Sequence, residues 1–278
     1  MRTWIEEINK SGNAARGEAI YRRMELQCIA CHAIGPVGGI VGPNLVSIGS
    51  SAPMDYIIDS LLEPAKKIKE GYATAMITTK DGATHTGFLA REDQREIVLR
   101  DNAGKMQTIP AAQVSKKEVI PVSLMPAGLT HSLRRDELAD LVKFLTELGK
   151  DGAYKVQEDG TLRNWQSFQN ETQSLPLTTW VDGSIELKEV PVIQLLGKPK
   201  RKLESAFELS KDGTVTLAIE GADNARIELN GQELFVKEGK IRQPLKAGRH
   251  SVRLLIPEPS NARPRVRLLD ATAKPIHE

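Results

Sequence analysis

The sequence predicts an α+β protein of two domains. A helical domain at residues 1–150 carries a small antiparallel sheet inserted at about 71–120, and an all-β sandwich follows at 151–278. The length of 278 residues exceeds the usual size of one domain. Apolar residues recur at helical spacing near both ends of the first domain. In the middle of that domain, apolar and polar residues alternate with a period of two. The second domain shows only short strand-like runs between turn residues.

Helical periodicity predicts four helices in the first domain. The first covers the opening segment, with Ile5 and Ile8 at helical spacing, and is broken at Gly12-Asn13. The others run from about Asn13 to Met24, from Met54 to about Glu63 and from Arg134 to Leu148. Pro64 ends the third helix, and Gly149 serves as the C-cap of the fourth. Between the second and third helices, residues 35–53 are rich in Gly and Pro, which predicts a loop.

The inserted sheet is predicted from a change of period. Short runs rich in Thr and β-branched residues occur at Tyr72–Thr79, Thr84–Ala90, Ile97–Arg100 and Lys105–Ile109. The turns between them are Lys80-Asp81-Gly82 and Asp101-Asn102-Ala103-Gly104. These features predict a small antiparallel sheet between helices.

The second domain begins after Lys150-Asp151-Gly152. Asn230-Gly231 between two apolar runs is a strong hairpin signal. Regular spacing of short strands is typical of a β-sandwich. The strand candidates are Ser184–Val190, Ala206–Leu209, Thr214–Glu220, Arg226–Leu229, Glu233–Val236, Ser251–Ile256 and Arg265–Leu269.

Composition excludes several classes of function. The net charge of +2 gives no electrostatic reason to expect a nucleic-acid partner. No apolar run approaches the roughly 20 residues that a transmembrane helix needs, so no membrane span is expected. The basic run at residues 198–202 is interpreted as solvated surface.

The sharpest motif is Cys28-Ile29-Ala30-Cys31-His32, which matches the pattern for covalent attachment of a c-type haem. Residues three apart on a helical turn share one face, so both sulfurs can reach the two vinyl groups along one haem edge. His32 follows directly and can bind the iron. Cys28 and Cys31 are the only cysteines of the chain, which does not suit a disulfide framework.

Three other interpretations of this motif are weaker. A thioredoxin-like dithiol follows a strand, whereas a helix is predicted here. A zinc site needs a fourth ligand, and the remaining histidines show no recognisable spacing. An inert buried pair does not require the adjacent histidine.

The surrounding segments resemble class I cytochromes c. Gly17-Glu18-Ala19-Ile20-Tyr21 before the cysteine motif is similar to that family's N-terminal helix, and Gly42-Pro43-Asn44-Leu45 to its proximal loop. Ser123-Leu124-Met125-Pro126 resembles its distal methionine loop, ahead of the last helix. The inserted sheet and the segments 68–72 and 123–129 are similar to a haem-binding domain common in planctomycete and verrucomicrobial proteins. That domain is often joined to sugar-dehydrogenase-like modules, and the resemblance covers about residues 13–149.

The resemblance implies one covalent haem c, with thioether bonds to Cys28 and Cys31 and with His32 and Met125 as axial ligands. It also implies that the carbonyl beside Pro43 accepts the imidazole N–H of His32. Gly17 would let the last helix approach closely, against Tyr21 and Phe144.

His131 is the rival of Met125 as distal ligand, and the interpretation of His131 as a surface residue is preferred. The other methionines fit helix faces or strands, at Met24, Met54, Met76 and Met106, or the terminus, at Met1. The remaining histidines are expected at the surface or in the tail, at His85, His250 and His277.

The second domain faintly resembles the PA14-type sugar-binding sandwich. Asp223-Asn224 stands where calcium-binding members of that family have paired aspartates, so calcium is not expected. Trp165 and Trp180 could stack on a sugar ring or anchor the linker against the core.

These features predict single-electron transfer by a haem c with histidine and methionine ligands. The expected partner is a periplasmic dehydrogenase or another cytochrome, the chain is a carrier rather than an enzyme, and the resemblance implies export from the cytoplasm. One alternative is a haem-based gas sensor or peroxidase-like enzyme in which Met125 is labile. A second alternative is a carbohydrate-binding module that carries a haem domain.

Overall fold

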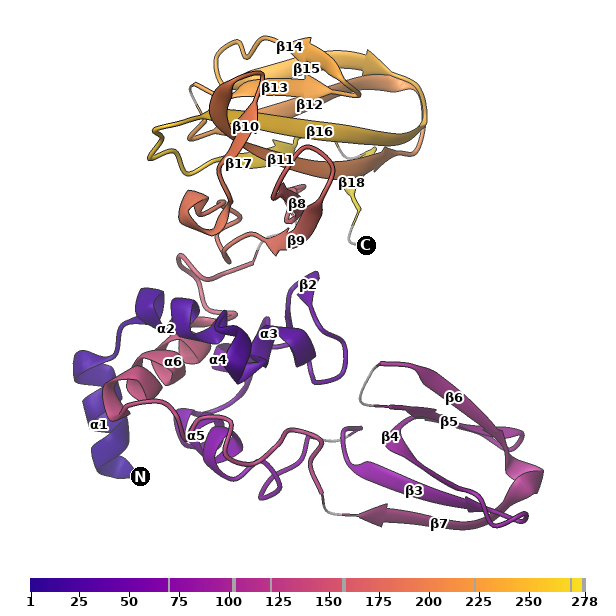
Figure 1. Ribbon diagram of the computed structural model, residues 1–278. Coiled ribbons are helices and arrows are strands. Elements are labelled where there is room, and N and C mark those ends of the chain that lie inside the picture. The colour runs from indigo at the N-terminus through magenta and orange to yellow at the C-terminus, as the bar shows by residue number, and fades with distance from the viewer. Residues whose placement is uncertain are drawn as a thin grey trace. The chain divides into compact units, whose positions relative to one another are not determined.

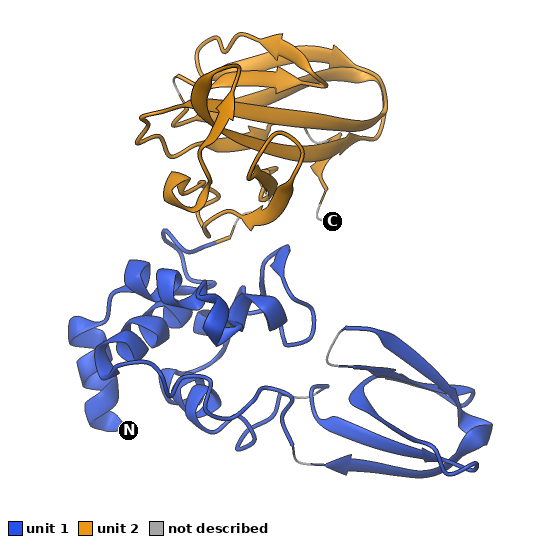
Figure 2. Cartoon of the chain, in the orientation of Figure 1, with its two compact units in different colours: residues 1–155 blue, residues 156–278 orange. Residues whose placement is uncertain are grey.

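The structure is a computed structural model that describes residues 1–69, 71–101, 104–120, 122–156, 159–222, 224–270 and 272–276 (Figure 1). The chain forms two compact units, Met1–Lys155 and Val156–Glu278 (Figure 2). The domain boundary predicted at Lys150-Asp151-Gly152 falls within the last residues of unit 1. Helices and strands both occur, and strands are the more numerous elements.

Unit 1 holds the helices. They are α1 (Arg2–Ser11), α2 (Ala14–Tyr21), α3 (Cys28–Cys31), α4 (Ile48–Ser51), α5 (Met54–Leu62) and α6 (Arg135–Glu147). The end of α1 and both bounds of α5 and α6 agree closely with the prediction. The second predicted helix was too long, because α2 ends at Tyr21 and a short 3-10 turn, η1 (Met24–Leu26), follows. Met24 is therefore not on an apolar helix face, and it is 88% exposed.

Helices α2 and α6 pack closely. A Cβ on Gly17 would lie 2.0 Å from the carbonyl oxygen of Asp140, so only glycine permits this approach. The rings of Tyr21 and Phe144 pack beside it with centroids 5.6 Å apart. The Asp140 carboxylate is almost fully buried and accepts hydrogen bonds from the Arg16 guanidinium at 2.6 and 2.9 Å. This packing fixes the helical frame around the cysteine motif.

The inserted sheet has five antiparallel strands in the order β6-β5-β4-β3-β7. The strands are β3 (Thr74–Thr79), β4 (Thr84–Glu92), β5 (Glu96–Arg100), β6 (Met106–Pro110) and β7 (Val114–Ile120), with the 3-10 turn η2 (Ala111–Gln113) before β7. Four strands match the prediction, and β7 was missed because Ser115–Lys117 in its first half are polar and exposed at the sheet edge. The turn residues Asn102 and Ala103 lie outside the described residues. A small core, Ala75, Ile77, Ile97, Leu99 and Ile109, stabilises the sheet.

Unit 2 is a sandwich of two antiparallel sheets. The larger sheet has the order β14-β13-β16-β11-β8-β9, with β10 and β18 also pairing with β11, and the smaller has the order β15-β12-β17. The strands are β8 (Asn164–Phe168), β9 (Ser174–Thr178), β10 (Ile193–Leu195), β11 (Lys198–Leu209), β12 (Gly213–Glu220), β13 (Arg226–Leu229), β14 (Gln232–Leu234), β15 (Lys240–Leu245), β16 (Gly248–Pro257), β17 (Arg265–Leu268) and β18 (Ala273–Pro275). Side chains from both sheets, such as Phe207 and Leu217, form one core.

The predictions for unit 2 were partly wrong. Ser184–Val190 is not a strand but irregular chain with a 3-10 turn, η3 (Leu187–Glu189), although its apolar residues are buried. The basic run at 198–202 forms the start of β11, where its residues are exposed or half-buried. The missed strands are β8, β9, β10, β15 and β18. β10 and β18 are only three residues long, and polar residues or proline interrupt the apolar alternation of the other three.

Across the residues that the structure describes, no helix is long and apolar enough to cross a bilayer. A further hairpin, missed in the predicted loop, pairs β1 (Ala33–Ile34) with β2 (Val37–Gly38) directly after the cysteine motif. It turns the chain back towards α3 and so positions the glycine-rich loop beside His32.

Candidate functional site

A largely apolar cavity of about 200 Å³ lies in unit 1, between the cysteine motif, α5 and the segment before α6. Its lining includes all five residues that the sequence predicted for the site: Cys28, Cys31, His32, Pro43 and Met125. These positions are up to 97 residues apart in sequence (28 to 125), and the fold brings them to one cavity.

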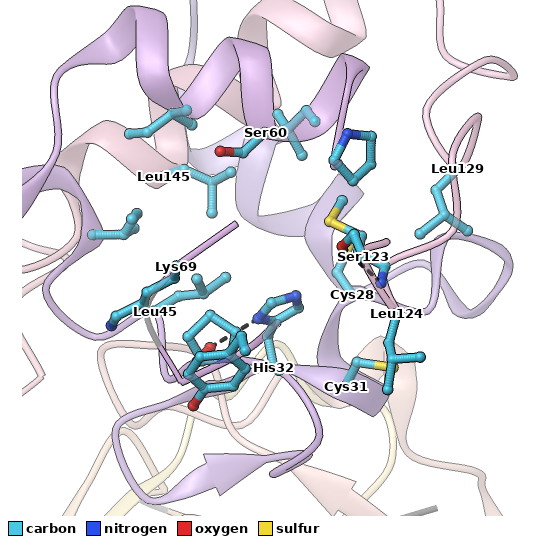
Figure 3. Close-up of a pocket in the computed structure, with 18 of the residues that line it drawn as sticks. Cys28, Cys31, His32, Leu45, Ser60, Lys69, Ser123, Leu124, Leu129 and Leu145 are labelled. Carbon is cyan, nitrogen blue, oxygen red and sulfur yellow. Dashed lines mark hydrogen bonds between the residues drawn. The ribbon is translucent and has the colours of Figure 1, made fainter. Parts of the chain in front are cut away.

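His32 ends α3 and lies beside the glycine-rich loop. Its Nδ1–H donates a hydrogen bond to the carbonyl oxygen of Pro43 at 2.8 Å, shown as a dashed line in Figure 3. This bond fixes the tautomer with the proton on Nδ1 and leaves Nε2 as a lone-pair donor. Burial lowers the pKa of His32, and the Pro43 carbonyl only partly opposes that shift. The shift favours the neutral ring, which is the form that binds a metal.

The glycine-rich loop packs its backbone directly against the cysteine motif. The Gly42 N–H donates to the Cys31 carbonyl at 2.8 Å, and a Cβ on Gly42 would lie 2.4 Å from Cε1 of the His32 ring. The Tyr21 hydroxyl donates to the His32 carbonyl at 2.8 Å. Helix α2 and the loop thus hold His32 from two sides.

Cys28 and Cys31 project from the single turn α3 and are free, half-buried thiols. Burial raises the pKa of Cys28 to about 11. Redox-active dithiols instead have a lowered thiol pKa, because the thiolate is the attacking species. This shift argues against the thioredoxin-like alternative and leaves Cys28 as a neutral thiol at the apolar cavity.

Met125 enters the cavity from the loop before α6. Its backbone N–H donates to the Ser123 hydroxyl at 3.1 Å, which orders the turn that carries it. His131 is exposed and does not line the cavity, so the fold favours Met125 over His131 as a partner of His32. Among the other methionines, Met24 is 88% and Met106 is 54% exposed.

Several polar residues of the cavity were missed in the sequence. Tyr56 and Ser60 come from α5, and Lys67 and Lys69 from the segment after it. In Figure 3, Lys69 lies on the opposite side of His32 from Cys28 and Cys31. No local motif marks these residues, because helix α5 is recognisable only by its apolar stripe.

The residues present fit a covalently bound haem. Two thiols lie on one helical turn, a neutral imidazole with a free Nε2 lies beside them, and a thioether sulfur lines the same apolar cavity. Imidazole and thioether are the axial ligands of haem in many c-type proteins. The glycine at position 42 leaves the imidazole the space that a larger residue would fill.

The expected sugar-stacking residues of unit 2 are not at its surface. Trp165 is 2% and Trp180 is 6% exposed, so both belong to the core.

His250 was expected at the surface and is instead buried, hydrogen-bonded to Asn230 and to the Lys246 carbonyl at 2.9 Å each. On the inserted sheet, Gln107 Nε2 and His85 Nδ1 form a hydrogen bond of 2.7 Å. Asp223 and His277 lie outside the described residues.

Comparisons with known proteins identify no family. No protein-family model matches the chain, and no curated protein matches it. A solved structure of a family 35 carbohydrate-binding module from an environmental isolate is 14% identical, covers 43% of this chain and 93% of its own, and has a TM-score of 0.27. A family 35 module from Paenibacillus barcinonensis is 14% identical, with 26% and 72% covered and a TM-score of 0.22.

An α-xylosidase from Xanthomonas citri is also similar, at 14% identity and a TM-score of 0.23. The match covers 39% of this chain and 14% of that enzyme, so the chain spans a small part of its length.

These findings correct the predicted main function. The similar structures are described as carbohydrate-binding modules and a glycosidase, and none of the three is described as a cytochrome. Within the described ranges, no group of three or more His, Cys, Asp or Glu side chains could hold a metal ion. Single-electron transfer to a dehydrogenase or respiratory chain is therefore withdrawn, and with it the redox partner.

Proposed function

We propose that this chain is a carbohydrate-binding protein whose first unit carries one covalently bound haem c. The observation that carries the haem assignment is the meeting of Cys28, Cys31, His32 and Met125 at one cavity, with the His32 ring oriented by Pro43. The resemblance to class I cytochrome c domains supports the same cofactor.

Each site residue has a defined role in this proposal. Cys28 and Cys31 tether the macrocycle, His32 supplies the proximal nitrogen, and Met125 supplies the distal sulfur. The Pro43 carbonyl orients the imidazole and raises its basicity through the 2.8 Å hydrogen bond. A haem held by these residues would supply one-electron redox chemistry, and a thioether ligand would raise its reduction potential.

Attachment requires no oxidant. Each cysteine S–H adds across one vinyl C=C bond, so that an S–C bond forms and the thiol proton moves to the other vinyl carbon. Because burial holds Cys28 in the thiol form, that proton is present at neutral pH. The family resemblance implies that such attachment takes place outside the cytoplasm, so we propose export of the chain.

Carbohydrate binding is proposed for unit 2. The β-sandwich leaves Phe235, between β14 and β15, 83% exposed, and the neighbouring Val236 is also exposed. Flat aromatic rings in water are favourable surfaces for the C–H face of a sugar. Phe235 therefore replaces Trp165 and Trp180 as the proposed sugar-stacking residue.

Haem attachment is tested by producing the chain in a host with cytochrome c maturation machinery and extracting it with acidified organic solvent. Colour should stay with the parent protein and be extracted from the Cys28→Ala/Cys31→Ala variant. Met125→Ala should change the visible spectrum of the oxidised protein, whereas Met24→Ala, at an exposed position, should leave it unchanged. Haem that is extracted equally from the parent and the double variant contradicts the proposal.

Carbohydrate binding is tested with the full chain on a glycan array. Phe235→Ala should abolish the binding that the parent shows, and Phe235→Tyr should retain it. Leu196→Ala is the matched control, since Leu196 is also 83% exposed in the same unit but is not aromatic. Absence of binding by the parent, or equal losses in the Phe235 and Leu196 variants, argues against the proposal.

A further inference from the structure

We propose that the inserted sheet completes the cofactor site, with Arg100 of β5 and Lys69 binding the propionate carboxylates of the haem. This inference rests on the proposed haem. It assigns a carboxylate-binding role to a part of unit 1 that supplies neither a thioether nor an axial ligand.

Arg100 ends β5 and reaches away from its sheet to the glycine-rich loop. Its Nη2 donates to the Val41 carbonyl at 3.2 Å, and its guanidinium lies 5.5 Å from the ring centroid of Tyr72 and 5.3 Å from that of Phe88. Val41, Tyr72 and Phe88 all line the cavity, so the guanidinium lies against the cavity wall.

The hydrogen-bonding capacity of Arg100 is incompletely used. Its Nε is buried and has no hydrogen-bond partner within the described part of the chain. A buried N–H of a charged group without an acceptor is unfavourable. A guanidinium binds a carboxylate through two parallel N–H groups, and Nε–H is one of those that take part in such pairs. A carboxylate at the cavity edge would satisfy it.

Lys69 offers a second cation at the same cavity. Its side chain is exposed, and it forms no ion pair with another described residue, whereas Lys67 lies 3.7 Å from the Asp59 carboxylate. Figure 3 shows Lys69 across His32 from Cys28 and Cys31.

The orientation follows from the chemistry of the macrocycle. The two vinyl groups lie along one edge of the porphyrin, and the two propionates leave from the opposite edge. Once Cys28 and Cys31 hold the vinyl edge, the carboxylates must point to the side of the cavity away from them. Two carboxylates entering a largely apolar cavity need cationic partners. Lys69 lines the cavity, and Arg100 contacts three residues that line it.

The test uses the haem-loaded full chain and measures the midpoint reduction potential as a function of pH. Arg100→Gln should lower the potential, because removing a nearby positive charge disfavours the less positive reduced iron. The pH-dependent part of the profile should move to higher pH, because a propionate without its cation keeps its proton longer. Arg100→Lys should restore the potential in part, and Lys69→Gln should shift it in the same direction as Arg100→Gln.

Arg95→Gln is the matched control, because Arg95 is an exposed arginine in the turn between β4 and β5 of the same sheet. Its potential and pH profile should equal those of the parent. Parent-like profiles in haem-loaded Arg100→Gln and Lys69→Gln, or an equal shift in Arg95→Gln, would overturn the inference. If Arg100→Gln does not accumulate as folded protein, Lys69→Gln can still be compared with the parent, because Lys69 is exposed and its substitution disturbs no core packing. A parent chain that takes up no haem instead contradicts the proposed function.

Discussion

At the scale of single residues, the site depends on close approaches that only particular side chains permit. Gly42 is the clearest case, because the His32 ring occupies the space that a Cβ at this position would need. Gly17 serves the same purpose where α2 crosses α6. Both glycines act through the position of a neighbour rather than through a strained backbone.

Gly42→Ala should displace the His32 imidazole and break its bond to Pro43, because the added methyl group would lie 2.4 Å from Cε1. Overpacking of this kind costs about 1–3 kcal/mol of unfolding free energy. Urea denaturation of the haem-free chain measures this cost, and the spectrum of the loaded chain reports the lost ligand. Gly213→Ala is the control, since the nearest atom to its added Cβ is 4.0 Å away. Equal stability of Gly42→Ala and the parent would show that the loop can move aside.

The residues of this site were predictable to unequal degrees. Cys28, Cys31 and His32 form a local motif, and Pro43 and Met125 followed from family resemblance. Lys69 and Arg100 were missed, since a lysine after a helix and an arginine at a strand end are ordinary surface patterns. Arg100 contacts Val41, a residue 59 positions away, and no local sequence pattern encodes that contact.

At the scale of secondary structure elements, α6 is held at two positions along its length. At its start, the Glu137 carboxylate accepts hydrogen bonds from the Arg23 guanidinium at 2.7 Å and from the Arg134 backbone N–H at 3.0 Å. Further along, the buried Asp140 carboxylate bonds Arg16 and the backbone N–H of Asn13, the latter at 2.7 Å. These contacts tie α6 to α2 and to the turn before the cysteine motif.

Asp140→Asn should destabilise unit 1 by about 1–3 kcal/mol, because the amide replaces one acceptor oxygen with a donor that faces N–H groups. Chemical denaturation of the haem-free chain measures the change. Asp136→Asn, one turn earlier on the same helix and exposed, is the comparison and should change stability much less. A loss in Asp140→Asn no larger than in Asp136→Asn would mean that the carboxylate is dispensable for α2–α6 packing.

The stability of unit 1 should also fall in acid through Glu137. Hydrogen bonds from Arg23 and then from the Arg134 backbone lower the pKa of Glu137 below its ordinary value of 4.5. A carboxylate with a lowered pKa in the folded state contributes stability above about pH 4.5, and this contribution is lost as the pH falls through its folded-state pKa. The stability difference between the parent and Glu137→Gln should therefore be constant near neutral pH and shrink below pH 4.5. An Arg23→Gln background should reduce that difference at neutral pH. A difference that is independent of pH would contradict this role.

The elements themselves were predicted where periodicity is long and regular, as in α5 and α6. β7 was missed, because an edge strand with a polar outer face lacks a clear alternation. Ser184–Val190 was wrongly assigned because its apolar residues are buried by the tertiary structure without pairing in a sheet. Local propensity does not distinguish a buried irregular segment from a buried strand.

At the scale of the whole molecule, the two units have separate cores. The core of unit 2 consists entirely of residues between Leu162 and Ala273, contributed by both sheets of the sandwich. A fragment of residues 156–278 should therefore fold alone and unfold in one cooperative thermal transition. Circular dichroism of the fragment and of the full chain measures this, and a fragment that melts without cooperativity would show that unit 2 needs unit 1.

The account depends above all on a haem joined to both cysteines, and intact mass spectrometry of the denatured protein tests this directly. Produced with the maturation machinery, the parent chain should be heavier than its polypeptide by the mass of one haem. Cys28→Ala/Cys31→Ala should show the mass of the polypeptide alone. A parent chain with only the polypeptide mass, under conditions in which a control c-type protein is loaded, would contradict the central claim.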